Sequence, residues 1–192
     1  MNFKKHLEIA WHQLFDHIAS LIILTSVLLA VSIFSFGILA PVVTAGYMHT
    51  ILVMLREDRK PSVSDLFSQM KLFFPLLGFS ILLLIVTMIG MALFIIPGIV
   101  ILFLFTFVFI YLIPLMTDLE MNLFDAMKKS YAMAVKENPS EHFIVVILYL
   151  CILSIGSSVF IGTIVTTPFA VIFLLSVYIE KMRAIFPPEK QR

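Results

Sequence analysis

Long apolar stretches alternate with short charged ones along this chain. The longest, residues 72–117, contains no Asp, Glu, Lys or Arg, and Pro97-Gly98 interrupts it near its middle. A helix that crosses a membrane needs about 20 apolar residues. This stretch therefore predicts two crossings joined by a tight turn.

Two more stretches have the same plan. Residues 17–55 and 143–179 are also free of formal charge, and Pro41 and Pro168 interrupt them. The pattern predicts an all-α integral membrane protein with six transmembrane helices, arranged as three proline-turn hairpins. The arm 42–55 is the shortest and would span about 21 Å, at about 1.5 Å per residue, so its full crossing is the least secure of the six.

The segments that precede these hairpins are amphipathic. Residues 2–16, 62–71 and 122–136 each place apolar side chains at helical spacing, with Lys and Arg elsewhere. Ser62 and Asn122 stand where helix N-caps are expected. We call these three segments the collar, because they are expected to lie along one membrane surface.

The whole chain, 1–192, is expected to form one membrane domain. A surface helix, a crossing, a proline turn and a second crossing recur in order, which suggests a three-fold internal repeat of residues 1–57, 58–118 and 119–186. Ancestral duplication and a shared hairpin architecture both explain this pattern.

The distribution of charge predicts the orientation. Every charged residue lies at the N-terminus, in the two connectors between hairpins or in the tail, and the proline turns have none. Because Lys and Arg favour the cytoplasmic side, both termini and the collar are expected in the cytoplasm. Residues expected at the lipid headgroups are Lys4, Lys5, Trp11, Arg56, Arg59, Lys60, Lys71, Lys128, Lys129, Lys181 and Arg183.

Composition agrees with a membrane location. Apolar residues make up 61% of the chain and charged residues 13%, whereas soluble domains are about 45–50% apolar. The net charge of +1 gives no basic field for nucleic acid. The single cysteine, Cys151, allows no intramolecular disulfide.

The predicted crossings contain little that could carry chemistry. His49 is open to two interpretations, a proton-handling group or a neutral side chain bonded to a neighbouring helix. Asp118 with Glu120, or Asp125 with Glu141, could form an acid–base pair at the surface, although a solvated face is the commoner explanation. No catalytic, metal-binding or cofactor-binding motif occurs, so we expect no enzyme, no metal and no cofactor.

Small side chains suggest where helices approach closely. Ser154, Ser158 and Gly162 recur every four residues, a spacing that favours helix packing in membranes. Packing within the protein and association with a second copy both fit this pattern.

Several of these residues resemble a known family. Ile95-Ile96-Pro97-Gly98-Ile99, residues 125–130 (DAMKKS) and Pro41 with Gly46-Tyr47 look like the YciC-like group of bacterial inner-membrane proteins. That group is related to the membrane domain of some glycerophosphodiester phosphodiesterases. The resemblance covers about residues 18–180. It implies six helices in a bacterial inner membrane and supplies no catalytic residue.

Two functions follow as hypotheses. The first is a non-enzymatic accessory or assembly factor that binds membrane lipids, a membrane-protein partner or a second copy through its cytoplasmic collar. The alternative is a small-molecule transporter or channel, which would need a polar path through the helices.

Overall fold

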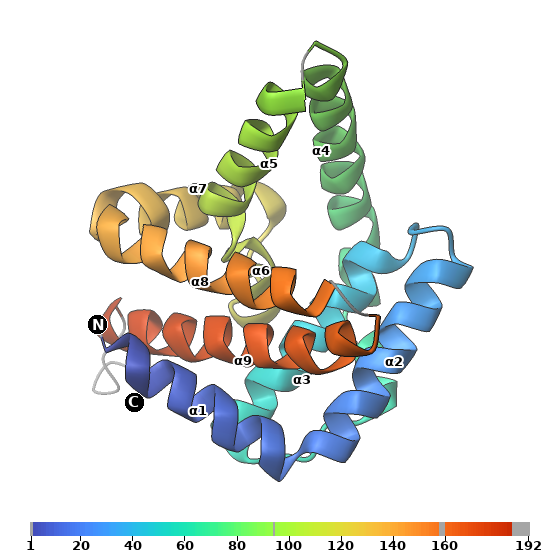
Figure 1. Cartoon of the computed structure of the whole chain (residues 1–192), viewed down its shortest axis with the longest axis vertical. Helices are drawn as coiled ribbons and strands as arrows, with labels where there is room; N and C mark the ends of the chain where they lie inside the picture. The colour runs from blue at the N-terminus through green and yellow to red at the C-terminus, as the bar shows by residue number, and fades with distance from the viewer. Residues whose placement is uncertain (1, 94, 158–159, 186–192) are drawn as a thin grey trace.

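A computed structural model describes residues 2–93, 95–157 and 160–185, and most of these residues are helical, with no strand among them (Figure 1). The helices are α1 (Phe3–Asp16), α2 (Ile18–Phe34), α3 (Ala40–Glu57), α4 (Phe73–Leu93), α5 (Ile95–Phe109), α6 (Leu112–Asp118), α7 (Leu123–Tyr131), α8 (Pro139–Ser157) and α9 (Phe160–Ile185). Two short 3₁₀ segments, η1 (Val63–Phe67) and η2 (Met70–Leu72), precede α4, and a π-helical segment, η3 (Ala132–Glu137), follows α7.

Four helical segments in this part of the chain are long and apolar enough to cross a membrane. They are Val63–Ala92, Ile95–Asp118, Pro139–Ser157 and Gly162–Ile185. A fifth results if α1 and α2, which meet at a bend of 90°, count as one broken span. The fold is therefore an all-helical one with four or five candidate crossings, compatible with a location in a membrane.

Helices that follow one another in the sequence pack together. α4 packs along α5, α8 along α9 and α2 against α3, while α1 lies on α9. In Figure 1 the pair α4–α5 rises away from the other helices, and α8 and α9 run across the view below it. Most of the buried core consequently lies among α3, α6 and α9, and its largest fully buried side chains include Tyr47, Tyr111, Phe173 and Tyr178.

The first amphipathic segment forms a helix, as predicted. Asn2 caps α1 by accepting a hydrogen bond from the backbone N–H of Lys5 (3.2 Å). His6, Ala10 and Leu14, spaced by four residues, form its buried stripe. Trp11, expected at the headgroups, is 56% exposed and its ring contacts Phe15.

The second and third amphipathic segments differ in regularity. Asn122 caps α7, since its Oδ1 accepts from the backbone N–H of Asp125 (2.9 Å). Ser62 precedes η1 but makes no side-chain cap hydrogen bond, and its hydroxyl pairs with that of Ser64 (2.9 Å). The connector before α4 is therefore a pair of short 3₁₀ turns instead of one regular helix.

The three prolines predicted to form hairpin turns lie at different places relative to the helix ends. Pro41 is the second residue of α3, after a turn in which Phe36 and Gly37 adopt positive φ. α4 ends at Leu93 and α5 begins at Ile95, so Pro97 and Gly98 lie in the first turn of α5. A proline is tolerated there because the first N–H groups of a helix have no intrahelical acceptor.

The prediction that Pro168 forms the third turn is wrong. Pro168 lies inside α9, eight residues after that helix begins at Phe160, whereas α8 ends at Ser157. A proline removes one backbone hydrogen bond and is tolerated within membrane helices when neighbouring groups satisfy the freed carbonyl. Packing of α9 against α8 and α1 therefore outweighs the tendency of proline to end a helix.

The predicted stripe of small residues is also wrong. Ser154 belongs to α8 and Gly162 to α9, so the two do not share a helix face, and Ser158 lies outside the described residues. The close approach lies between α8 and the start of α9, and Gly162 does take part in it. A Cβ added at Gly156 would overlap the side chain of Thr166, and a Cβ added at Gly162 would lie 2.9 Å from the Gly156 carbonyl oxygen. Thr163 Oγ1 also donates to the Gly156 carbonyl (3.2 Å).

Candidate functional site

Polar side chains gather around the C-terminal half of α9. Ser176, Tyr178, Glu180 and Lys181 lie within two turns of that helix and contact three different neighbours, namely α1, α6 and η3. We call this group, together with the side chains it contacts, the α9 polar cluster. It is the main concentration of polar interactions in the buried part of the described chain.

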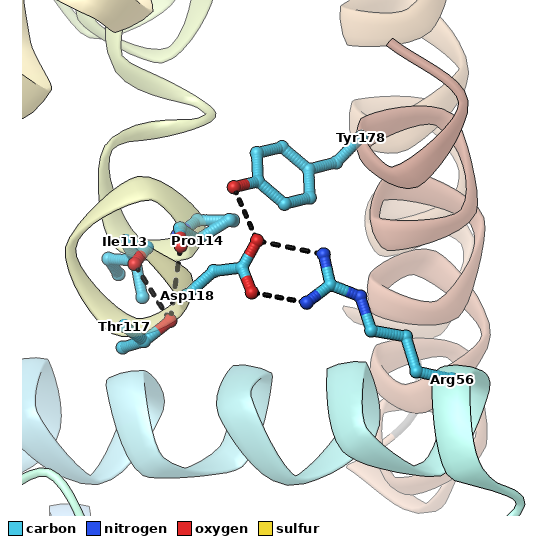
Figure 2. A network of polar contacts seen from close by, with 6 residues as sticks. All are labelled: Arg56, Ile113, Pro114, Thr117, Asp118 and Tyr178. Atoms are coloured by element: carbon cyan, nitrogen blue, oxygen red, sulfur yellow. Dashed lines mark hydrogen bonds and ion pairs between the residues drawn. The ribbon is translucent and has the colours of Figure 1, made fainter. Parts of the chain in front are cut away.

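Asp118 is the centre of this cluster (Figure 2). Its side chain is 7% exposed and receives both guanidinium nitrogens of Arg56, with Nη2 donating to Oδ2 at 2.8 Å and Nη1 donating to Oδ1. The hydroxyl of Tyr178 also donates to Oδ2 (2.9 Å). A bidentate arginine with a third donor is among the stronger hydrogen-bonding arrangements for a carboxylate.

Local structure brings these three groups together. Arg56 is in the last turn of α3, where the helix dipole favours a positive charge. Asp118 is the last residue of α6, where the same dipole disfavours a negative charge. The hydroxyl of Thr117 donates to the Ile113 and Pro114 carbonyls and fixes that last turn. The pair therefore compensates the unfavourable position of Asp118 and ties α3 to α6.

A second set of aromatic and basic groups adjoins this pair. The rings of Tyr111 and Tyr178 lie 6.1 Å apart, and the Lys181 ammonium lies 5.6 Å from the centre of the Tyr111 ring. Lys181 Nζ also donates to the Met133 carbonyl (3.3 Å). His142 packs on Tyr111 and its Nε2 lies 2.5 Å from the Phe107 carbonyl. These contacts join α9 to α5, α8 and η3.

His6 attaches α1 to the same stretch of α9. Its ring is 2% exposed, with Nδ1 2.9 Å from the Ser176 hydroxyl and Nε2 3.1 Å from Glu180 Oε2. The α1 helix is therefore held on the protein through its buried face, while its aromatic side chains Trp11 and Phe15 remain half exposed.

The basic residues predicted at the lipid headgroups divide into two groups. The first group has protein partners: Arg56 pairs with Asp118, Arg59 with Asp65 and Lys71 with Glu120. Lys181 donates to the Met133 carbonyl of η3, and Lys4 lies 3.7 Å from Glu8. The hydrogen bond and charge of Lys71 hold the pKa of the exposed Glu120 below its usual value. The side chains of Lys5, Lys60, Lys128 and Arg183 make no hydrogen bond or ion pair with any described residue. Lys129 lies on α7.

The carboxylates considered as acid–base pairs do not converge. Asp118 binds Arg56, Glu120 binds Lys71, and Asp125 accepts from the Asn122 amide (2.7 Å). Within the described residues no group of three His, Cys, Asp or Glu side chains could hold a metal ion. His49 keeps a buried Nδ1 without a hydrogen-bond partner among them.

Sequence reasoning missed the roles of His6, Ser176 and Tyr178. Each lies in a helix, without a motif, and its partner is up to 170 residues away. One signal could have identified Tyr178 and Glu180, since polar residues are costly at the end of an apolar helix unless they have partners.

No protein-family model, curated protein or solved structure matches this chain.

Proposed function

We propose that this chain is a six-crossing protein of the bacterial inner membrane, with both termini and the collar (α1, η1, η2, α7 and η3) in the cytoplasm. In this proposal it is a non-enzymatic member of the YciC-like group that binds membrane lipid or a membrane-protein partner through the collar. The two crossings beyond the four clearest candidates are α2 and α3.

The observation that best supports this proposal is that some basic side chains are paired with protein groups and others are not. Arg56, Lys71 and Lys181 are engaged by protein groups. Lys60 and Lys128, by contrast, are exposed and have no partner in the described chain. Near them the collar exposes large apolar side chains, among them Phe67 (40%) and Phe124 (72%). Exposed cations beside exposed aromatic groups are typical of surfaces that contact anionic headgroups.

The orientation is tested by labelling. In a Cys151→Ser background, Ile96→Cys places a thiol beside Pro97, at the end of the α4–α5 pair remote from the collar. A membrane-impermeant maleimide should label this position only from the periplasmic side, and Lys60→Cys only from the cytoplasmic side. Labelling of Ile96→Cys from the cytoplasm would contradict the six-crossing topology.

The binding activity is tested by purification in a mild detergent, followed by mass spectrometry of the lipids and proteins that remain bound. Specific retention of an anionic lipid or of one membrane protein is the expected result. Retention of neither would contradict the proposal.

A transporter or channel is the second candidate, and buried polar atoms favour it. His49 Nδ1, Thr50 Oγ1, Tyr111 Oη and His142 Nδ1 are buried without hydrogen-bond partners among the described residues, and such groups can line a polar path. Selective flux of a solute into proteoliposomes that is lost in Thr50→Val would support this alternative. Absence of flux would leave lipid or partner binding as the function.

A further inference from the structure

A groove lies where the C-terminal end of α5 meets α7 and η3. Its volume is about 510 Å³, and it is lined by Phe109, Met127, Lys128, Tyr131, Ala132 and Lys136. This size is within the range of small-molecule sites, about 300–1,000 Å³. The lining combines an apolar and aromatic wall with two ammonium groups, a combination that suits an amphiphile with a negative charge.

The wall of the groove is held in place from behind. Ser130 is fully buried, and its hydroxyl donates to the Val108 carbonyl (2.7 Å), which fixes α7 against the end of α5. Met133 is also fully buried, and its carbonyl accepts from Lys181 of α9 (3.3 Å). The spacing between Phe109 and the α7–η3 side chains is therefore set by the fold and does not depend on a ligand.

The two lysines of the groove carry uncompensated charge. Both are exposed, and neither makes a hydrogen bond or ion pair with the described residues. Lys136 belongs to η3, where the chain departs from α-helical into π-helical geometry. Such departures are rare and are frequent at functional sites. An anion between the two ammonium groups would supply the missing charge.

The position of the groove indicates the source of that anion. α5 belongs to the candidate crossing Ile95–Asp118, and α7 is an amphipathic helix with Lys128 in its last turn. The groove thus opens where an apolar helix meets a polar one. At such a boundary a phospholipid places its phosphate beside the charged groups and its acyl chains along the apolar ones.

We propose that this groove binds one anionic phospholipid. The phosphate lies between Lys128 and Lys136, and the start of one acyl chain lies along Phe109, Met127 and Tyr131. This inference rests on the proposed function, since it names the lipid class and the place on the collar where the lipid binds.

The test is a lipid titration of the full chain in a mild detergent. Phosphatidylglycerol and phosphatidylcholine with the same acyl chains are added separately, and bound molecules are counted by native mass spectrometry. The wild type is expected to bind one phosphatidylglycerol at lower concentration than phosphatidylcholine. The Lys128→Gln/Lys136→Gln variant is expected to bind phosphatidylglycerol about thirtyfold more weakly, with phosphatidylcholine binding unchanged.

Two further variants separate the groove from general surface charge. Lys60→Gln/Arg183→Gln removes two cations of the proposed headgroup surface that lie outside the groove; it should leave binding of the first phosphatidylglycerol unchanged and weaken only the binding of further molecules. Ala132→Phe keeps both lysines but fills the groove, and it should weaken phosphatidylglycerol binding. Glycerol phosphate, which has the anion without acyl chains, should not compete; equal competition would indicate a site for a free phosphate compound and overturn the lipid assignment.

The outcomes distinguish this inference from the proposal on which it rests. If Lys60→Gln/Arg183→Gln weakens binding of the first phosphatidylglycerol and Lys128→Gln/Lys136→Gln does not, the lipid binds elsewhere on the headgroup surface and only the groove is refuted. If the wild type shows no preference for phosphatidylglycerol, the groove is refuted together with lipid binding by the collar. Both lysines are exposed, so their replacement is not expected to unfold the protein. If Ala132→Phe is unstable, the Lys128→Gln/Lys136→Gln variant alone tests the groove.

Discussion

Helices α3 and α4 have similar lengths but opposite surroundings. α3 is not among the helices apolar enough to count as candidate crossings, yet most of its side chains from Val42 to Met54 are buried. α4 belongs to the strongly apolar segment Val63–Ala92, and only 11% of the most apolar window of that segment is buried. The more apolar of the two helices is therefore the more exposed one.

This difference shows how the usual relation between hydropathy and burial changes in a membrane. Lipid solvates apolar side chains as well as a protein interior does, so apolar surface alone does not drive helices together. Membrane helices associate instead through small residues that allow close approach and through polar groups that need partners. α3 has both, in Gly46 and in the partnered side chains of Tyr47 and Arg56, whereas α4 presents Leu84, Ile85 and Met88 outward.

The largest expected effect comes from adding a side chain where α3 meets η1. A Cβ on Gly46 would overlap the backbone carbonyl groups of Leu66 and Asp65, which cannot move aside as a side chain can. Gly46→Leu is therefore expected to prevent recovery of folded, monodisperse protein, measured by size-exclusion chromatography in detergent. The control is Gly78→Ala in α4, where a Cβ meets nothing within 4 Å; this variant should be as stable as the wild type or more so.

Removing a buried side chain of α3 should have the next largest effect. Ile51 is 0% exposed, so Ile51→Ala should lower the free energy of unfolding by about 3 kcal/mol through the cavity it leaves. Ile85 in α4 is 50% exposed, and Ile85→Ala should change the free energy of unfolding by less than about 0.5 kcal/mol. Chemical denaturation in detergent measures both, and equal losses would show that α4 is buried in the native protein.

The α9 polar cluster should contribute less than the apolar core of α3. Asp118→Asn leaves the Arg56 guanidinium without its charged partner, and we expect a loss of about 2 kcal/mol, because Arg56 remains 39% exposed and can be hydrated. The matched control is Glu120→Gln, which removes the exposed pair with Lys71 and should have no measurable effect. A larger loss for Glu120→Gln would contradict the central role of Asp118.

The smallest effect concerns a hydrogen bond between α2 and α3. The hydroxyls of Thr25 and Tyr47 lie 2.8 Å apart, and Thr25 also donates to the Leu21 carbonyl (2.8 Å). Tyr47→Phe should therefore reduce stability by only about 0.6 kcal/mol, the average for such bonds between membrane helices. Thr106→Val in α5, whose hydroxyl bonds its own helix at Leu102, serves as the control and should have no measurable effect.

Several features could be predicted because they depend on residues close in the chain. The apolar stretches predicted helices long enough to cross a membrane, and the helical spacing of apolar residues in 2–16 predicted the amphipathic helix α1. Asn122 predicted the start of α7, since a cap needs only an N–H three residues away. The concentration of charge outside the apolar stretches was likewise visible in the sequence.

Other features depended on contacts that only the folded chain makes. Pro168 is compatible with a turn or with a membrane helix, and packing of α9 against its neighbours decided for the helix. Arg56 was predicted at the lipid headgroups, and its pairing with Asp118, 62 residues away, could not be predicted from local sequence. Local sequence thus determined which segments are helical, because backbone hydrogen bonds and caps are short-range. Tertiary structure alone decided which charged groups are paired inside and which, such as Lys128 and Lys136, are left to contact something else.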